Sequence, residues 1–234
     1  MTLPSYWTRF LNSIFGIKSR YPANHDHPAQ HVAILVIVEG IHDMQFLRRI
    51  SRMLHVHNSE RPDLGAWEQA GKLIFIPFGG SEAAVWSLRL APLRLPEFHL
   101  FDRETQPLSE ERRRAAEIVN CRQHCRAAIT TKRSLENYLH PDCLREVRGL
   151  ALEIDDEACV AELVAQRLYA SGENANAWAS VPYRSRRKLK ERAKHWLNTA
   201  AVDRMTVERL RERDPKGEVQ SWLRTIARLA AAEG

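Results

Sequence analysis

The chain has 234 residues, of which 44% are hydrophobic and 27% charged. These are ordinary values for a globular protein with a hydrophobic core, and they exclude wholesale disorder, a disulfide-built miniprotein and a collagen-like fibre. The longest apolar run, residues 32–38, is far shorter than the roughly 20 residues of a membrane span, so we expect no membrane partner. Four cysteines and the lack of a secretory leader pattern predict reduced thiols and a cytoplasmic location.

The first 31 residues predict an N-terminal segment, here called the lead, that precedes the main fold. Five apolar side chains recur there at helical spacing and predict a short amphipathic helix that docks on the body of the protein or on a partner: Trp7, Phe10, Leu11, Ile14 and Phe15. A stretch with prolines and histidines then predicts a linker. We therefore expect three parts, namely this lead (1–31), a catalytic core (32–140) and a helical C-terminal region (141–234).

Residues 32–140 alternate between short apolar stretches and segments with helical periodicity. The apolar stretches predict four strands, at Ala33–Val38, Lys72–Pro77, Phe98–Phe101 and Ala127–Thr130. The periodic segments predict helices over Met44–Leu54, Ser81–Leu90 and Leu108–Cys121. Strands that alternate with helices pair in parallel through right-handed crossovers. The expected fold class is therefore α/β, a parallel sheet of about four strands flanked by helices, with a helical C-terminal part.

Polar residues follow each of these four strands. Ligands of open parallel sheets bind beyond the carboxyl ends of the strands, so residues at these positions are expected to meet at one edge. The set comprises five carboxylates, a Gly-Gly-Ser turn and three cations: Glu39, Asp43, Gly79, Gly80, Ser81, Asp102, Arg103, Glu104, Lys132, Arg133 and Glu136.

The residue types in this set favour metal and phosphate chemistry. Crowded carboxylates repel one another unless a divalent cation lies between them, and oxygen ligands favour Mg²⁺ or Mn²⁺ over zinc. Gly79, Gly80 and Ser81 at the start of a helix are expected to offer backbone N–H groups to a phosphate. Each residue alone has an ordinary alternative, as a first-turn carboxylate or a turn residue. Together they predict phosphoryl transfer on a nucleic acid.

The positive charge is concentrated in one segment. The net charge is +6, and residues 183–196 alone account for that excess. This basic stripe suits a phosphate backbone, although a solvated helix face is an equal alternative. The nucleic-acid-binding residues predicted there are Arg184, Arg186, Arg187, Lys188, Lys190 and Lys194. A second run, Arg112 to Arg114, is interpreted as a solvated helix face.

The strand-end motifs resemble those of a known family. VIVEG at Glu39 and FDRE at Asp102 and Glu104 are similar to the Glu and the Asp-x-Asp of the Toprim domain, a Rossmann-like metal-binding fold. The segments VEGIHD, PFGGSE, HLFDRE, KRSLENYLHP and DPKGEVQSWLRTIARL resemble the Toprim region of the OLD (overcoming-lysogenization-defect) nucleases. This resemblance spans about residues 32–229.

The resemblance implies roles for individual residues. The implied metal ligands are Glu39, Asp43, Asp102, Glu104 and, as a ligand or a ligand-orienting acid, Glu136. Lys132 or Arg133 is implied to contact the phosphate. The family implies DNA cleavage with two ions, Mg²⁺ or Mn²⁺, of which one activates water and the other stabilises the leaving oxygen.

The sequence also departs from the family pattern. Asp-x-Glu replaces Asp-x-Asp, and Ser134 stands where the family often has another acid. No ATPase phosphate-loop motif is present, so the resemblance implies an ATPase on a separate chain, or a module that acts alone or as a homo-oligomer.

The expected function is a metal-dependent endonuclease, a DNA hydrolase in phage or plasmid defence. Two alternatives stay open, namely an RNase that acts on tRNA or precursor RNA, and a non-catalytic adaptor that binds nucleic acid.

Overall fold

The computed structural model describes residues 32–80, 82–172 and 177–232. The expected amphipathic helix of residues 1–31 lies outside the described residues, and so does Ser81. The division of the remaining chain near residue 140 stays a prediction. In the described part of the chain, every helix is too short or too polar to cross a lipid bilayer.

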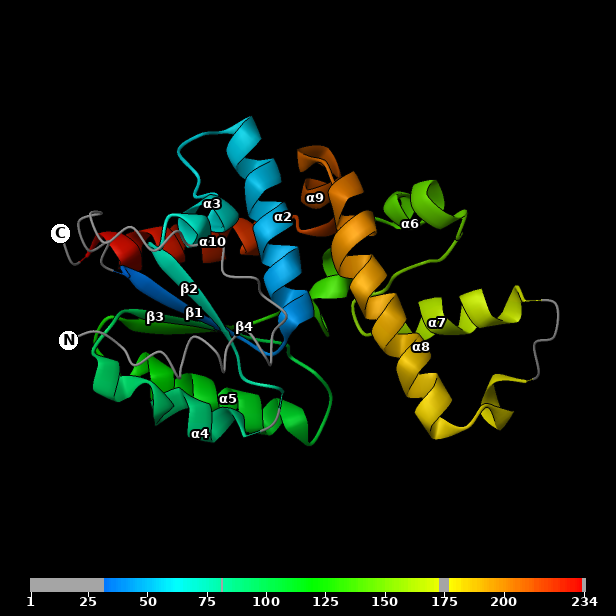
Figure 1. Ribbon diagram of the computed structural model, residues 1–234, viewed down its shortest axis with the longest axis horizontal. Helices are drawn as coiled ribbons and strands as arrows, with labels where there is room; N and C mark the ends of the chain where they lie inside the picture. The colour runs from blue at the N-terminus through cyan, green and yellow to red at the C-terminus, as the bar shows by residue number, and fades with distance from the viewer. Residues whose placement is uncertain (1–31, 81, 173–176, 233–234) are drawn as a thin grey trace, which may run out of the picture. The chain divides into compact units, whose positions relative to one another are not determined.

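The four expected strands form one parallel sheet (Figure 1). They are β1 (Ile34–Val38), β2 (Leu73–Pro77), β3 (Glu97–Phe101) and β4 (Cys125–Ile129), in the spatial order β2-β1-β3-β4. The inner strands β1 and β3 are buried along their whole length, as expected of a sheet that is covered on both faces. The predicted α/β class is therefore confirmed.

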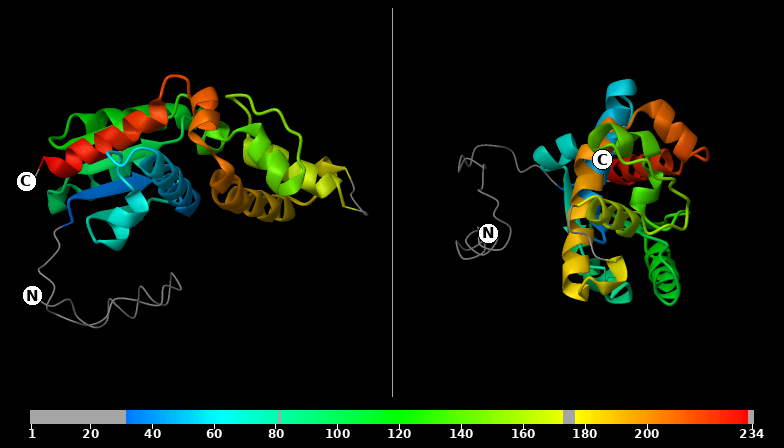
Figure 2. Two further views of the ribbon diagram at one scale, coloured as in Figure 1. Left: turned by 90° about the horizontal axis from the view of Figure 1, so that it is seen from above. Right: turned by 90° about the vertical axis from the view of Figure 1, so that its right-hand side faces the viewer.

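Helices cover both faces of the sheet, as Figures 1 and 2 show. One face is covered by α2 (Ile41–His57), α3 (Leu64–Gln69) and α10 (Glu218–Ala231), and the other by α4 (Ala83–Arg89) and α5 (Leu108–Asn120). Alternate residues of β1 enter two separate cores, since Val36 packs in the larger core and Ile37 in the smaller one.

The chain after β4 is helical, as predicted. It forms α6 (Pro141–Arg148), α7 (Val160–Ala170), α8 (Tyr183–Trp196) and α9 (Val207–Arg213) before α10. Short helical turns lie between these elements: η2 (Leu135–Tyr138), η3 (Trp178–Ser180), η4 (Leu197–Ala201) and η5 (Val202–Arg204). A further turn, η1 (Ala91–Leu93), lies between α4 and β3.

One contact of this helical region positions the candidate site. Helix α8 packs against α7 and continues into the π-helical turn η4, which packs against α2. The last turn of α8 is thereby held close to α2, the helix that begins directly after β1. Side chains from the C-terminal region can therefore reach the carboxyl edge of the sheet.

Candidate functional site

Three carboxylates meet at the carboxyl edge of the sheet. Oxygen atoms of Glu39, Asp102 and Glu104 lie within 4.8 Å of one another. Glu39 follows β1 and Asp102 follows β3, and these strands are neighbours in the sheet. Asp102 is buried with 8% exposure, whereas the other two side chains are partly exposed. Within the described part of the chain, no other set of His, Cys, Asp and Glu side chains has this spacing.

Glu104 has an unusual backbone conformation. Its φ is +51°, in the left-handed region that costs a residue with a Cβ about 1 kcal/mol or more. A hydrogen bond from its N–H to the Arg133 carbonyl, 3.1 Å long, links this turn to the segment after β4. Contacts between two strand ends therefore hold Glu104 in the conformation that brings its carboxylate beside Glu39 and Asp102.

Asp43 and Glu136 lie next to this group without belonging to it. Asp43 is in the first turn of α2, where its Oδ2 accepts the Gly40 N–H at 2.7 Å. Glu136 lies in η2, is buried, and accepts a hydrogen bond from Asn198 Nδ2 at 2.8 Å. Burial, followed by the charges of Glu136 and Glu39, raises the pKa of Asp43 to about 7. The metal-ligand role of these two acids stays a prediction.

The pKa values of two carboxylates in the site are raised above their ordinary values. Burial, together with the charges of Asp43, Glu39 and Glu136, raises the pKa of Asp102 well above its usual value. Burial also raises the pKa of Glu39, although Arg112 opposes this shift. A hard divalent cation relieves this repulsion, and the oxygen donors fit Mg²⁺ or Mn²⁺.

Lys194 brings a positive charge to the acidic cluster. The sequence places it on the basic stripe, and the structure places it in the last turn of α8, beside the acids. Burial opposes its charge, but the carboxylates of Glu136, Asp43 and Asp102 outweigh burial and hold the pKa of Lys194 well above its usual value. In turn, although burial opposes ionisation of Glu136, Lys194 and Asn198 keep its pKa below the ordinary value.

Asn198 was not expected from the sequence. It lies one turn after Lys194, in η4, and its amide nitrogen donates both to Glu136 and to the Lys194 carbonyl. The four-residue spacing to a lysine could have indicated a shared helix face. The position of this helix face beside the carboxylates depends on the packing of η4 against α2, which the spacing alone does not reveal.

Arg112 is buried, which contradicts the expectation that residues 112–114 form a solvated helix face. Its side chain is 1% exposed, and Nε donates to Glu39 Oε1 at 2.7 Å. It also donates to the Gly80 carbonyl and lies over the ring of Phe78. The basis of the error is visible in the helix, because Arg112 shares a stripe with the buried residues Ala115, Ala116 and Val119. Arg113 and Arg114, in contrast, are exposed as expected.

The glycine turn differs from the expected phosphate cradle. Gly79 and Gly80 have φ values of +87° and +75°, which glycine adopts without strain. However, the Gly79 N–H donates to the Glu39 carbonyl at 2.9 Å, so the expectation that it is free for a phosphate is wrong. The helix that follows, α4, begins only at Ala83. A phosphate contact at Gly80 and Ser81 stays a prediction.

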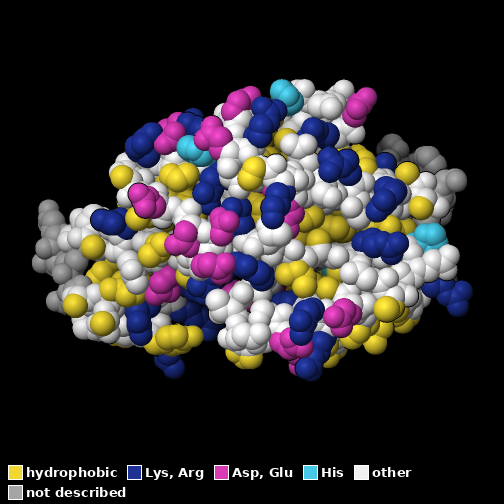
Figure 3. Space-filling model, turned by 180° about the vertical axis from the view of Figure 1, so that it is seen from behind, with side chains coloured by type: hydrophobic (Ala, Val, Ile, Leu, Met, Phe, Trp, Pro, Cys, Tyr) yellow, Lys and Arg dark blue, Asp and Glu magenta, His cyan; other side chains and the backbone are white. Residues whose placement is uncertain are grey.

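The cations at the strand ends are largely engaged by other parts of the chain. Lys132 pairs with Asp156, and Arg103 pairs with Glu157 at 2.5 Å. Both acids belong to residues 155–157, between α6 and α7, which we call the acidic strap. Arg133 is 3.9 Å from Glu104 and therefore reaches the carboxylate group. Figure 3 likewise shows acidic and basic side chains interspersed on the face seen from behind.

The basic stripe of α8 divides into exposed and engaged cations. Arg184, Arg187 and Lys188 are exposed. Arg186 is partly buried, and Lys190 is 3.8 Å from Glu162 of α7. The exposed members remain candidates for contact with a nucleic-acid backbone, whereas Lys194 is partly buried and interacts with the charges of the carboxylates.

Comparisons with solved structures identify a similar fold. The C-terminal region of the Xanthomonas campestris pv. campestris OLD protein matches 86% of this chain and 97% of that chain, with 17% identity and a TM-score of 0.50. The C-terminal region of the Burkholderia pseudomallei OLD protein matches 86% of this chain and 100% of that chain, with 12% identity and a TM-score of 0.49. A scan against protein-family models and a search of curated proteins find no match. The first likeness shows an OLD-like fold and, at this identity, the fold alone.

Proposed function

We propose that this protein is a divalent-metal-dependent endonuclease with Toprim-type chemistry. The observation that carries the proposal is the group of Glu39, Asp102 and Glu104, whose oxygens lie within 4.8 Å of one another at the edge where parallel sheets bind ligands. The OLD-like fold supports the resemblance of the sequence motifs to the OLD nucleases.

The residues fit a hard divalent cation. Three carboxylates converge, and the pKa values of Asp102 and Glu39 are raised in the absence of a cation. Glu39, Asp102 and Glu104 would hold one Mg²⁺ or Mn²⁺ ion, and Asp43 and Glu136 are the remaining candidates for a second. When bound, the ions supply an activated water and stabilise the leaving oxygen.

The protein's own cations bind and orient the phosphodiester. Lys194 lies close enough to the carboxylates for their charges to act on it, and its ammonium can neutralise the charge that develops on the scissile phosphate. Arg133 lies against Glu104 and is the second candidate for this contact. Lys132 can take part only after it leaves Asp156. Arg112 orients Glu39 from the buried side and does not face the substrate.

DNA is the proposed substrate, and tRNA or precursor RNA is the alternative with the same metal chemistry. A role in phage or plasmid defence, with an ATPase on a separate chain, rests on the sequence resemblance. Assembly into a homo-oligomer also stays a prediction.

A cleavage assay tests the proposal. Supercoiled plasmid, linear duplex and tRNA are incubated with Mg²⁺, Mn²⁺ or EDTA. We compare the wild type with Glu39→Gln and Asp102→Asn, and use Glu117→Gln, an exposed acid on α5, as the matched control. Metal-dependent cleavage that both site variants lose and the control keeps supports the nuclease, and the polymer that is cut identifies the substrate. A titration with Mn²⁺ that is monitored by electron paramagnetic resonance measures metal binding independently of cleavage.

One observation favours a non-catalytic adaptor as the second candidate. Arg112 and Lys194 already supply positive charge to the cluster, so the carboxylates could be structural. An adaptor binds nucleic acid equally well in EDTA, cuts no polymer and binds no Mn²⁺ at this site. That combination of results would replace the nuclease proposal.

A further inference from the structure

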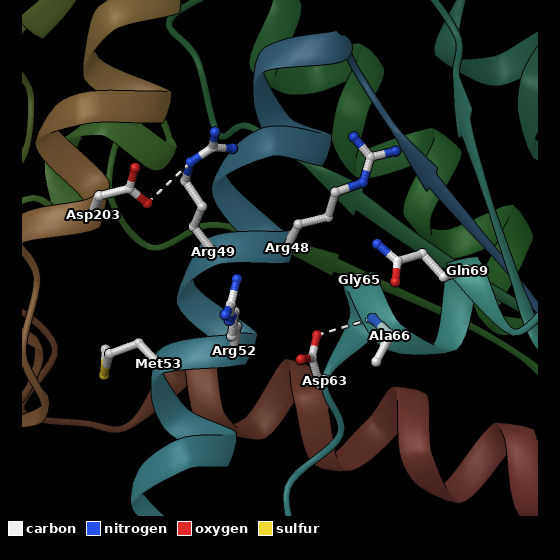
Figure 4. A pocket seen from close by; sticks show the side chains of 9 residues that line it. All are labelled: Arg48, Arg49, Arg52, Met53, Asp63, Gly65, Ala66, Gln69 and Asp203. Carbon is white, nitrogen blue, oxygen red and sulfur yellow. Dashed lines mark hydrogen bonds and ion pairs between the residues drawn. The ribbon is translucent and has the colours of Figure 1, made fainter. Parts of the chain in front are cut away.

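A cavity lined by three arginines lies outside the carboxylate site. It has a volume of about 680 Å³ and is lined by α2, α3 and η5. Figure 4 shows that three arginines of α2, namely Arg48, Arg49 and Arg52, line it, with Asp203 on one side and α3 on the other. None of these residues belongs to the site proposed above.

Two of the arginines are held in place by acids. Arg48 donates to both carboxylate oxygens of Glu68, at 2.6 and 2.7 Å, and lies over the Phe75 ring. Arg49 pairs through Nε with Asp203 at 3.1 Å. A guanidinium has five N–H donors, so each side chain keeps donors for a ligand. These ion pairs therefore orient the arginines without exhausting their hydrogen-bonding capacity.

Arg52 differs from its two neighbours. It is exposed and makes no hydrogen bond or ion pair with the described residues. The remaining acid of the cavity, Asp63, accepts the Ala66 N–H at 3.1 Å as the cap of α3. Asp203 is paired with Arg49, whereas Asp63 caps α3 and keeps its negative charge, so the lining has three arginines against two acids.

Helix α2 connects this cavity to the candidate metal centre. Asp43 lies in its first turn, and Arg49 and Arg52 follow six and nine residues later. At 1.5 Å per residue, the two arginines lie about 9 and 14 Å further along the axis. At 3.6 residues per turn, Arg52 lies on the opposite face of α2 from Asp43, so the separation along the axis is a lower bound on the distance between the cavity and the carboxylates.

We propose that the cavity of Arg48, Arg49 and Arg52 binds a phosphate of the nucleic-acid backbone at a distance from the bond held at the carboxylates. Planar guanidinium groups match phosphate oxygens in bidentate geometry, and contacts of this kind set the register of a nucleic acid without reading its sequence. This inference rests on the proposed function because it assumes a nucleic-acid substrate, but it needs no metal and no cleavage.

The salt dependence of binding tests it. A fluorescent duplex is titrated with protein in EDTA at several salt concentrations, and the logarithm of the affinity is plotted against that of the salt concentration. Each phosphate contact contributes about 0.9 to the slope. We expect Arg52→Gln to reduce the slope by about 0.9 and Arg52→Lys to restore it. Arg89→Gln, which removes an exposed arginine of α4 on the other face of the sheet, is expected to leave it unchanged.

The outcomes separate the inference from the nuclease proposal. An unchanged slope in Arg52→Gln overturns the inference, even if the protein cuts DNA. An equal loss in Arg89→Gln also overturns it, because binding is then diffuse. Adenosine monophosphate and inorganic pyrophosphate are titrated in parallel. If either binds the wild type and not Arg52→Gln while the slope stays constant, the cavity holds a small phosphate ligand and the backbone contact is rejected. A slope that depends on Arg52 supports the inference even where no polymer is cut.

Discussion

Arg112 donates a hydrogen bond to Glu39 at 2.7 Å from the interior of the protein, where its side chain is 1% exposed. Glu39 thus meets a guanidinium on its buried side and the carboxylates of Asp102 and Glu104 on its other side. Such a partner fixes the orientation of a ligand side chain before any metal binds. The buried ion pair also makes the fold sensitive to mutation, because removing one of the two charges leaves the other buried without a partner.

Arg112→Met is expected to lower the free energy of unfolding by about 3 kcal/mol in EDTA, since it leaves Glu39 without its buried partner. A bound divalent cation replaces the lost positive charge, so millimolar Mg²⁺ should stabilise this variant more than the wild type. Urea unfolding with and without Mg²⁺ measures both effects. Arg113→Met, on the exposed side of the same helix, serves as the control and should change stability by less than about 0.5 kcal/mol. Equal Mg²⁺ effects in all three proteins would argue against a metal at Glu39.

The raised pKa of Asp43 predicts a pH dependence of stability in EDTA. Its pKa is about 7 in the folded protein against an ordinary value of 3.8, so between these values the folded state binds the additional proton. Stability is therefore expected to fall as the pH rises through this window. Asp43→Asn keeps an oxygen for the Gly40 N–H, and above pH 7 its free energy of unfolding should exceed that of the wild type by up to about 4 kcal/mol.

Thermal unfolding across this pH range, in EDTA, compares the two proteins directly. The matched control is Asp155→Asn, which changes an acid outside the cluster. If the stability of the wild type and that of Asp43→Asn change with pH in the same way, the pKa of Asp43 is not raised and this prediction is wrong.

Much of the fold follows from local patterns in the sequence. The apolar stretches of β1 and β3 indicate strands because both of their faces are buried. Since parallel strands end at the same edge, the residues after them can be grouped from the order of the chain alone. Glu39, Asp102 and Glu104 are the part of the site that this reasoning finds, and their oxygens do converge.

The remaining contacts depend on the packing of distant segments. Lys194 lies 90 residues after Glu104 in the chain, and it reaches the carboxylates only because η4 packs against α2. Lys132 has the strand-end position expected of a phosphate contact, but Asp156 pairs with it across the fold. Periodicity describes the faces of one element at a time, so it does not reveal which charged partner meets that face.

The acidic strap pairs with cations that the proposed nucleic-acid substrate would also contact. Asp156 pairs with Lys132 and lies 3.6 Å from Arg213. Asp156→Asn is therefore expected to raise the affinity for duplex DNA, by about fivefold or less because Asp156 is largely exposed. Binding titrations in EDTA measure this, and Glu153→Gln, an exposed acid before the strap, is the control. A weaker affinity in Asp156→Asn would mean that Asp156 positions Lys132 for the phosphate rather than withholding it.

Lys194 and Lys188 lie on the same helix, and we expect them to act at different steps. The charge of Lys194 interacts with those of Glu136, Asp43 and Asp102, whereas Lys188 is exposed. Lys194→Met should lower the rate of cleavage at saturating substrate by about 100-fold, as expected when one donor to a developing charge is lost. Its Mn²⁺ binding should persist, because the removed charge is positive. Lys188→Met should weaken substrate binding and leave the saturated rate unchanged. Steady-state cleavage kinetics in the presence of Mg²⁺ separates the two effects. A normal saturated rate in Lys194→Met would mean that Lys194 only balances the charge of Glu136.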